Sequence, residues 1–387
     1  MSLSKITVNE GQGGTGRILT SDDNKSGFVF YLPSNQIPSG FTSGSKQVFS
    51  LADAEAVGVT VSATPISHYH ISEFYRVNPS GSLQVKFVTT PTGSTTFSEV
   101  SQLQIDADGE LNQIAVYTKK PFSTGMVDTL QSVLTQLKTD DTPAIGLLAA
   151  NYSGYTLSNI PTLATSQDNL VSVVLGQDGG GVGAALYVSQ GTSISCIGAA
   201  LGAVGASSVH ESIAWTGKFN LTGSGELDTL AFAMGTSYKN VTKTQLGQVN
   251  DKHYLFGLKY NGLNGSFFNS SFTAIAETSD YLTIERNRTI NKARKLLRSA
   301  LLPQLNSPLY LDDSGSLTIE TIGKFESLCA QALEGMKRAG ELSNYSIDID
   351  AAQDVLANDE LKITVKLLPV GVARFITINL GYTVSIA

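Results

Sequence analysis

The sequence has 387 residues, which is enough for two or three domains that each bury a hydrophobic core. Hydrophobic residues make up 41% of it, whereas charged residues make up only 15% and 37 residues are glycine. The net charge of −7 argues against nucleic-acid binding, which requires a basic surface. This composition is typical of a globular protein with many loops, and it favours a self-assembling protein over a free monomer.

The two cysteines, Cys196 and Cys329, stand apart in apolar segments, so we expect buried, reduced thiols. The first residues, MSLSKITVNEG, lack the apolar segment of a signal peptide. The longest apolar runs, 144–150 and 171–175, are too short to cross a bilayer. We therefore expect assembly in the cytoplasm and no direct membrane insertion.

Residues 1–27 are predicted to form an arm. Ile6 and Val8 alternate with polar residues as in a short strand, and a glycine-rich segment at 11–16 follows. Glycine-rich polar segments are flexible. A short strand on such a tether must pair with a sheet, either in its own body or in a neighbouring molecule.

Residues 28–276 alternate between strand and helix patterns, which predicts an α/β body of one or two subdomains. Ser50 has the spacing to Asp53 of a helix-capping residue, and Gly58 ends that helix. Strands are predicted at 28–32, 83–88, 113–118, 144–150 and 171–175, and helices at 67–77, at 126–137 and around the small-residue segment 198–202.

Residues 277–387 are predicted to form an α+β domain. Apolar residues recur at helical spacing from 290 to 301 and from 322 to 336, with Pro303 and Gly340 after the two helices. Two strands follow, each with an apolar residue at every second position. These positions are Leu361, Ile363, Val365 and Leu367 in the first strand, and Ile376, Ile378, Leu380, Tyr382, Val384 and Ile386 in the second.

The second of these strands needs a surface that covers its apolar face. Burial contributes about 1.5–3 kcal/mol for each large side chain, and each ladder hydrogen bond adds about 1 kcal/mol. The residues alone leave open whether the strand completes its own sheet or that of another molecule. The matching short strand at the opposite end of the chain favours the second interpretation.

Several segments, in this order along the chain, resemble the family of contractile tail sheath proteins from phages and phage-tail-like injection systems. They are FSLADAEAVG at 49–58, ISEFYRVNP at 71–79, VHESIAW at 209–215, the basic helix ERNRTINKARKLLR at 285–298, LLPQLNSPLY at 301–310 and LPVGVARFI at 368–376. No single segment is specific, whereas the ordered set spans most of the chain.

The resemblance implies a non-enzymatic subunit that stacks as six-fold rings around an inner tube and contracts to drive the tube through a target envelope. It implies an α/β outer body inserted between the N-terminal arm and an α+β inner domain at 277–387. The implied partners are further copies of the chain, the tube protein, a baseplate and a sheath terminator. Within the same class, the chain is alternatively a terminator or a baseplate component.

The resemblance also implies roles for particular residues. The donor strands that pair with neighbouring copies would be Ile6 and Val8 in the N-terminal arm and 376–386 at the C-terminal end, and the receiving edge would be 361–367. The basic helix carries the candidates for tube contact, which are Arg288, Lys292, Arg294, Lys295 and Arg298. Without the resemblance, these cations predict a solvated helix face. Lys324, Lys337 and Arg338 on the next helix compete for the same role.

Two glycine-rich segments raise the alternative of an enzyme. Residues 11–16 match the pattern G-x-G-x-x-G, but no apolar helix follows them. Residues 179–183 follow a predicted strand and are the better candidate for a phosphate-binding loop, but no Lys-Ser/Thr pair follows them, and a tight turn is the favoured interpretation. An α/β enzyme that binds a phosphorylated ligand there is therefore the alternative from another class of protein.

Two histidine-containing segments give weaker signals. His68, His70 and Glu73 have the residue types of a metal site, but no further ligand is evident. His210 and Glu211 lie beside two serines, yet the chain contains no G-x-S-x-G motif. We therefore expect neither a cofactor nor an enzymatic activity.

Overall fold

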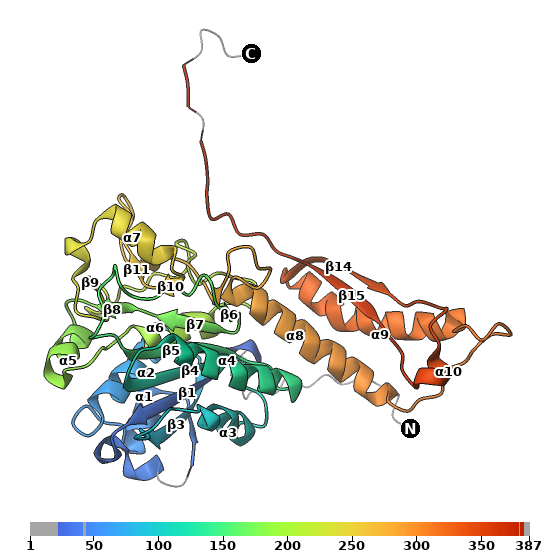
Figure 1. Ribbon diagram of the computed structural model, residues 1–387, viewed down its shortest axis with the longest axis horizontal. Helices are drawn as coiled ribbons and strands as arrows, with labels where there is room; N and C mark the ends of the chain where they lie inside the picture. The colour runs from blue at the N-terminus through green and yellow to red at the C-terminus, as the bar shows by residue number, and fades with distance from the viewer. Residues whose placement is uncertain (1–21, 42–43, 379, 383–387) are drawn as a thin grey trace, which may run out of the picture.

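The computed structural model describes residues 22–41, 44–378 and 380–382. An α/β body adjoins an elongated part made of two long helices and a hairpin, and the last described segment extends away from both (Figure 1). The prediction of a mixed α/β chain with more than one domain is confirmed. The boundaries predicted at 27/28 and 276/277 stay predictions.

The body is built on a seven-stranded sheet in which all neighbouring strands are parallel except β2 and β3. In their order across the sheet, the strands are β10 (Tyr254–Leu255), β7 (Val171–Val174), β5 (Ile145–Asn151), β4 (Gln113–Pro121), β1 (Lys25–Leu32), β3 (Ser82–Thr89) and β2 (Lys46–Val48). Parallel strands buried on both faces form continuous apolar runs, which is why the sequence predicts most of them correctly.

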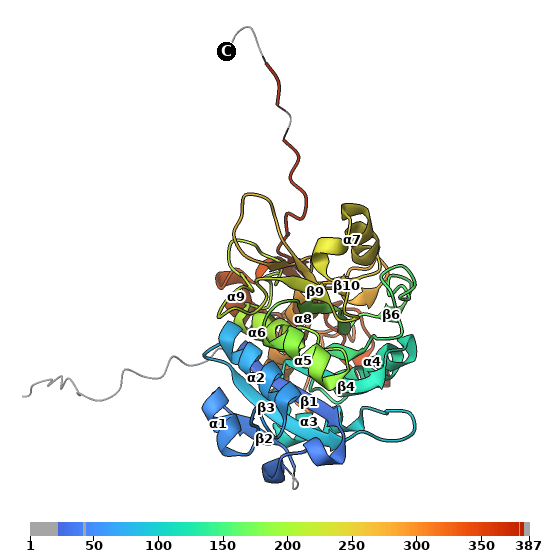
Figure 2. The same ribbon diagram turned by 90° about the vertical axis from the view of Figure 1, so that its left-hand side faces the viewer.

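Helices cover both faces of this sheet (Figure 2). Along β1, Phe28 and Phe30 belong to one hydrophobic core, whereas Val29 and Tyr31 belong to the other. This alternation follows from the two-residue period of a strand. The first core includes α2 (Pro65–Val77) and α6 (Ile197–Ala206), and the second includes α3 (Ser98–Asp106) and α4 (Thr124–Thr139).

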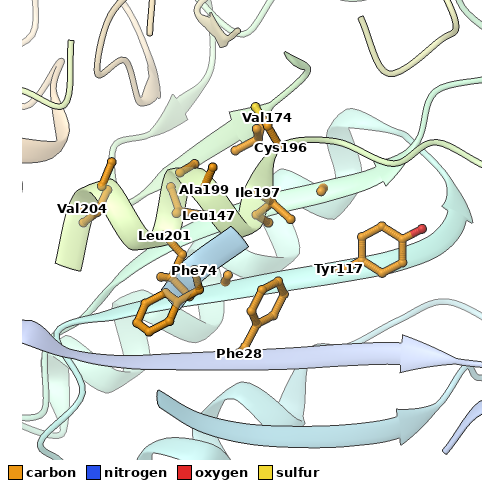
Figure 3. Packing of buried hydrophobic residues seen from close by; sticks show 14 of the residues in the cluster. Phe28, Phe74, Tyr117, Leu147, Val174, Cys196, Ile197, Ala199, Leu201 and Val204 are labelled. Atoms are coloured by element: carbon orange, nitrogen blue, oxygen red, sulfur yellow. The ribbon is translucent and has the colours of Figure 1, made fainter. Parts of the chain in front are cut away.

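The small residues of α6 allow it to lie directly against α2 (Figure 3). A Cβ atom on Gly198 would overlap the carbonyl oxygen of His70, and one on Gly202 would lie 2.8 Å from the carbonyl oxygen of Phe74. The backbones of the two helices are therefore in contact. The predicted helix around 198–202 is confirmed, and its small residues are what allow this contact.

Shorter elements complete the body. Ser50 caps α1 by accepting a hydrogen bond from the backbone of Asp53, as predicted. The remaining helices are α1 (Leu51–Ala56), α5 (Val182–Gln190) and α7 (Lys243–Asn250), with short 3-10 turns at Asp22–Asn24, Ser34–Gln36, Ser39–Phe41 and Tyr238–Asn240. Three short pairs of strands are β8 (Gly176–Asp178) with β9 (Leu230–Phe232), β11 (Gly257–Leu258) with β12 (Phe267–Phe268), and β6 (Gln167–Asp168) with β13 (Ala274–Ile275).

The C-terminal part pairs α8 (Ile284–Leu301) with α9 (Ile319–Arg338). A 3-10 turn (Leu302–Gln304) follows α8, and Gly340 adopts a positive φ just beyond α9. The hairpin of β14 (Leu342–Asp348) and β15 (Thr364–Pro369) packs on α9, and α10 (Val355–Asn358) lies between the two strands in the sequence. Both predicted helices are confirmed, and the predicted strand 361–367 begins at Thr364.

Both cysteines are buried and free, as predicted. None of the described helices combines the length and the apolar character needed to traverse a bilayer.

Candidate functional site

The C-terminal segment leaves the hairpin after β15 and runs away from the rest of the protein (Figure 1, Figure 2). Its predicted donor residues carry large apolar side chains, yet they are 79% exposed at Ile376, 80% at Ile378 and 96% at Leu380, and Tyr382 is fully exposed. None of these four residues belongs to a strand. The other predicted donor residues, Ile6, Val8, Val384 and Ile386, lie outside the described residues.

The predicted receiving residues all face the helices beneath them. Val365 and Leu367 pack against a cluster that includes Leu333 and Met336 of α9. Leu361 and Ile363, which precede β15, pack against a second cluster at the far end of α9. The predicted alternation is confirmed, because the intervening positions Lys362, Thr364 and Lys366 are exposed.

The hairpin itself is a two-stranded sheet. In the described part of the chain, β15 pairs with β14 alone, so each strand has one edge without a ladder partner. An open strand edge is a template for another strand. The receiving role of 361–367 stays a prediction.

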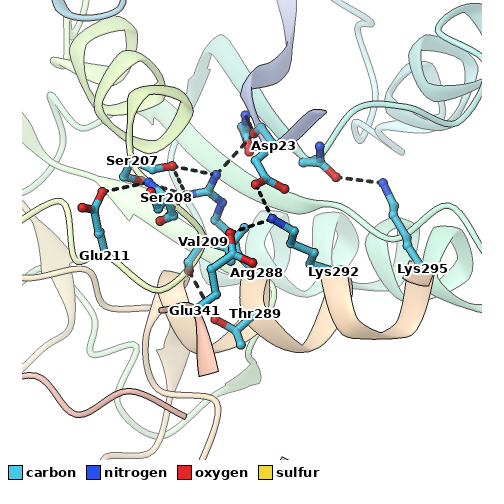
Figure 4. A network of polar contacts seen from close by, with 12 residues as sticks. Asp23, Ser207, Ser208, Val209, Glu211, Arg288, Thr289, Lys292, Lys295 and Glu341 are labelled. Atoms are coloured by element: carbon cyan, nitrogen blue, oxygen red, sulfur yellow. Dashed lines mark hydrogen bonds and ion pairs between the residues drawn. The ribbon is translucent and has the colours of Figure 1, made fainter. Parts of the chain in front are cut away.

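The basic face of α8 contacts the α/β body (Figure 4). At its centre, the Arg288 guanidinium donates to the Ser207 hydroxyl at 2.8 Å, to the Ser207 carbonyl at 3.2 Å and to the Asp23 carbonyl at 3.3 Å. Arg288 is only 3% exposed. Burial lowers the pKa of Arg288 to about 10, and surrounding carboxylates oppose that shift. The side chain is therefore still charged at neutral pH.

Lys292 lies one turn further along α8 and joins three parts of the chain. Its Nζ is 2.6 Å from Oδ2 of Asp23, next to β1, and 2.6 Å from Oε1 of Glu341, which follows α9. Burial alone would lower the pKa of Lys292, but the two carboxylates raise it overall. The ion pairs thus hold the root of the N-terminal arm, the body and the hairpin together.

The remaining cations of α8 are also paired with the body. Arg294 and Arg298 lie 3.3 Å and 2.7 Å from the Asp141 carboxylate, which follows α4. Hydrogen bonds, first from Arg298 and then from Arg294, lower the pKa of Asp141. The Lys295 Nζ donates to Oδ1 of Asn112 at 2.8 Å. All five predicted tube-contact residues therefore contact other parts of their own chain.

This placement corrects the prediction for Arg288, because a side chain that is 3% exposed has no surface to offer a tube. For Lys292, Arg294, Lys295 and Arg298, tube contact stays a prediction. The competing residues on α9, which are Lys324, Lys337 and Arg338, are exposed. The helix α8 has no acidic residue after Glu285, so any carboxylate that pairs with its later cations lies on another element.

The glycine-rich segment 179–183 leads into α5, but its backbone donors are already used. The Asp178 carboxylate accepts from the N–H groups of Gly181 at 2.5 Å and Ala184 at 3.3 Å, and Glu226 accepts from Val182 at 2.8 Å. A phosphate at a helix N-terminus needs these same donors. Two carboxylates already accept from these donors and would repel an anion. The segment 179–183 therefore does not support an enzyme that binds a phosphorylated ligand.

The histidine-containing segments are tied into other contacts. His68 lies 2.8 Å from Glu55, and Glu73 pairs with Arg76 at 2.6 Å. His70 is fully buried in the first core, where burial lowers its pKa to about 3. Within residues 22–41, 44–378 and 380–382, no group of three or more potential ligands is arranged around a metal site.

Glu211, the neighbour of His210 in the candidate catalytic pair, is also bound to other groups. Glu211 pairs with Lys218 at 2.6 Å and accepts the backbone N–H of Ser208. Burial acts first to raise the pKa of Glu211, but these hydrogen bonds lower it overall.

Three solved structures share this fold along almost the whole chain. A chain of the 6-fold symmetrised baseplate of the anti-feeding prophage gives a TM-score of 0.64 at 15% identity and covers 99% of each chain. A chain of the contracted PVC sheath complex, from an extracellular contractile injection system, gives 0.63 at 11% identity, covering 98% of this chain and 99% of that one. The sheath tail protein of Desulfitobacterium hafniense gives 0.53 at 8% identity, covering 95% and 100%.

At these identities the likeness establishes the fold, which is that of contractile tail sheath proteins, as the sequence resemblance predicted. The chain belongs to the DUF2586 family: its residues 3–272 match the N-terminal domain and its residues 280–387 match the C-terminal domain. No curated protein sequence matches the chain.

Proposed function

We propose that this protein is the sheath subunit of a contractile tail or injection apparatus. It polymerises as stacked six-fold rings around an inner tube, and a change in packing between subunits shortens the stack and drives the tube forward. The exposed C-terminal segment carries the proposal. Support comes from the fold shared with sheath proteins and from the open edges of the β14–β15 hairpin.

The segment 375–382 exposes apolar surface that a neighbouring molecule could cover. Five of its large apolar side chains, those of Phe375, Ile376, Ile378, Leu380 and Tyr382, are at least 79% exposed. Covering each one contributes about 1.5–3 kcal/mol, and pairing the backbone adds about 1 kcal/mol for each hydrogen bond. A neighbouring copy offers the backbone pairing, because among its described residues each strand of the hairpin has one edge without a ladder partner. The segment would thus add a strand to the sheet of another molecule.

Contraction requires subunits that stay connected while they rearrange. Two packings of the same surfaces, separated by a modest free-energy difference, are sufficient for such a switch, and no reactive group is needed. The arms would keep neighbours joined while the α/β bodies exchange contacts. Tube contact would fall to the exposed face of α9 or to the less buried cations of α8, and a baseplate and a terminator would close the two ends.

Deletion of residues 376–387 tests the proposal. The remaining chain keeps both cores and the hairpin, so its circular dichroism and its unfolding midpoint should match those of the full protein. The full chain should form hollow tubes in negative-stain micrographs, and the truncated chain should not. Tubes from the truncated protein would show that this segment is not a donor.

One observation favours a second candidate. A similar chain comes from a structure described as a baseplate, so a ring-forming component at the end of the tail fits the same fold. The same micrographs separate the two functions, since a sheath subunit forms long tubes and a terminal component forms single rings.

A further inference from the structure

The C-terminal arm is fastened to the body immediately before it becomes exposed. The Arg374 guanidinium lies over the Phe272 ring, with Cζ 4.5 Å from the ring centroid. The backbone N–H of Arg374 also donates to the Val372 carbonyl at 3.1 Å, which bends the chain at this point. The next residue, Phe375, is already 87% exposed.

Phe272 is a rigid base for such a contact. It is 3% exposed and stacks on His253, with ring centroids 4.4 Å apart and ring planes 17° apart. His253 is held in turn by a hydrogen bond between Nδ1 and the Ile275 carbonyl at 2.8 Å. The backbone of Phe272 forms a bridge with Thr283, the residue that precedes α8. The ring therefore sits where the body passes into α8.

We propose that Arg374 is a positioning residue that anchors the root of the C-terminal arm to the junction between the body and α8. An arginine over an aromatic face gains electrostatic attraction that a flexible linker lacks. The free part of the arm then begins at Phe375, and its direction of departure is set by Phe272 rather than by the hairpin.

The bases of the two arms are consequently held on α8 and just before it. Asp23, at the base of the N-terminal arm, is bound to Lys292, and Arg374 is bound beside the first turn of α8. On the proposed sheath function, a rotation of the body would carry both arms with it. The anchor is a property of a single chain, however, and can be tested without any assembly.

Spin labelling of the monomer provides the test. Both native cysteines are buried, and burial raises the pKa of the Cys196 thiol to about 12 and also raises that of Cys329, so an introduced cysteine reacts selectively. Nitroxides are placed at Ile376→Cys, two residues beyond the anchor, and at Leu380→Cys, further along the arm. Each is measured in the monomer fraction from size exclusion.

The label at 376 should be restricted and the label at 380 mobile in the native background. Arg374→Ala should reduce the ratio of anchored to free arm about 2- to 5-fold and shift the spectrum at 376 toward that at 380. Arg374→Lys, which keeps a cation, should retain part of the restriction. Arg338→Ala, which removes an exposed arginine from α9, should change neither spectrum.

Equal mobility at 376 with and without Arg374 would overturn the proposal, and so would immobile labels at both positions in the monomer. Failure of the full chain to form tubes would contradict the sheath function. It would not affect the proposed anchoring by Arg374, because the spectra are measured on the monomer.

Discussion

Replacing Lys292 by methionine keeps most of the volume of the side chain and removes the charge that Asp23 and Glu341 share. Both carboxylates lie 2.6 Å from Nζ, and their side chains are only 14% and 7% exposed. Removing one partner of a buried ion pair costs about 3–5 kcal/mol, because the remaining carboxylates lose a counter-charge while they stay buried. Lys292 itself is 26% exposed, which puts the expected loss near the lower end, at about 3 kcal/mol.

Urea unfolding measures this loss. Trp215 is the only tryptophan and reports on the body, whereas far-ultraviolet circular dichroism reports on all helices, including α8 and α9. In Lys292→Met the two transitions should separate, because a bridge between the body and the hairpin is lost. As a control, Arg338→Met removes a 79% exposed cation that pairs with Glu334 on the same helix, and it should leave the unfolding free energy unchanged.

A triple variant decides whether charge is responsible. Combining Lys292→Met with Asp23→Asn and Glu341→Gln removes both carboxylates together with the counter-charge that they share, so part of the lost stability should return. The recovery is incomplete because the buried Arg288 then loses the attraction of Asp23 and Glu341. If the triple variant is as unstable as the single one, the loss comes from packing. If Lys292→Met unfolds like the native protein, the network does not hold the parts together.

Three further substitutions test other parts of the structure. Asp128→Asn should stabilise the protein at pH 7.5 by up to about 1 kcal/mol, because burial and then the Asp128 carboxylate raise the pKa of Asp168 to about 6. The raised pKa of Asp168 makes the stability of the native protein fall as the pH rises from about 4 through 6. The stability that Asp128→Asn gains in urea unfolding should therefore vanish near pH 4. A gain that does not depend on pH would contradict this explanation. Gly198→Ala should lower the free energy of unfolding by about 1–3 kcal/mol, because α2 leaves no room for a Cβ atom. Gly323 faces open space, so Gly323→Ala should not destabilise the protein. Equal melting temperatures of the two variants would refute the packing argument. Leu380→Asp should leave the monomer's unfolding unchanged, since this residue is 96% exposed, yet lower the yield of sedimentable polymer; a native yield would speak against the donor role.

The sequence predicted the elements whose signal is local. The strands at 28–32 and 144–150 appear as continuous apolar runs because both faces of a parallel sheet are buried. The two long C-terminal helices follow from apolar residues at helical spacing. The close contact of α2 and α6 follows from Gly198 and Gly202, because only a segment of small residues allows two backbones to touch.

Errors arose where the decisive partner is remote in the sequence. The ion pairs of α8 could not be predicted, because Arg294 finds its counter-charge 153 residues away and Lys292 finds one 269 residues away. No spacing rule connects such positions. Burial of Arg288 against the Ser207 carbonyl likewise depends on how α6 ends, which the pattern of charges does not reveal.

One local signal and one remote contact were missed. Asp178 directly precedes the glycine-rich segment 179–183, and an aspartate there can accept the N–H groups of the loop itself. This use of the loop donors argues against the alternative of a phosphate-binding loop. Arg374 lies in a stretch that resembles sheath proteins, but its partner Phe272 is 102 residues earlier, so its anchoring contact was missed.

The position of residues 376–382 in an assembled particle tests the account most directly. A cryo-electron microscopy reconstruction of the polymer should show this segment as an added strand on the β14–β15 hairpin of a different copy. A map in which the segment pairs with the hairpin of its own chain, or lies unpaired along the outside of the particle, would contradict it.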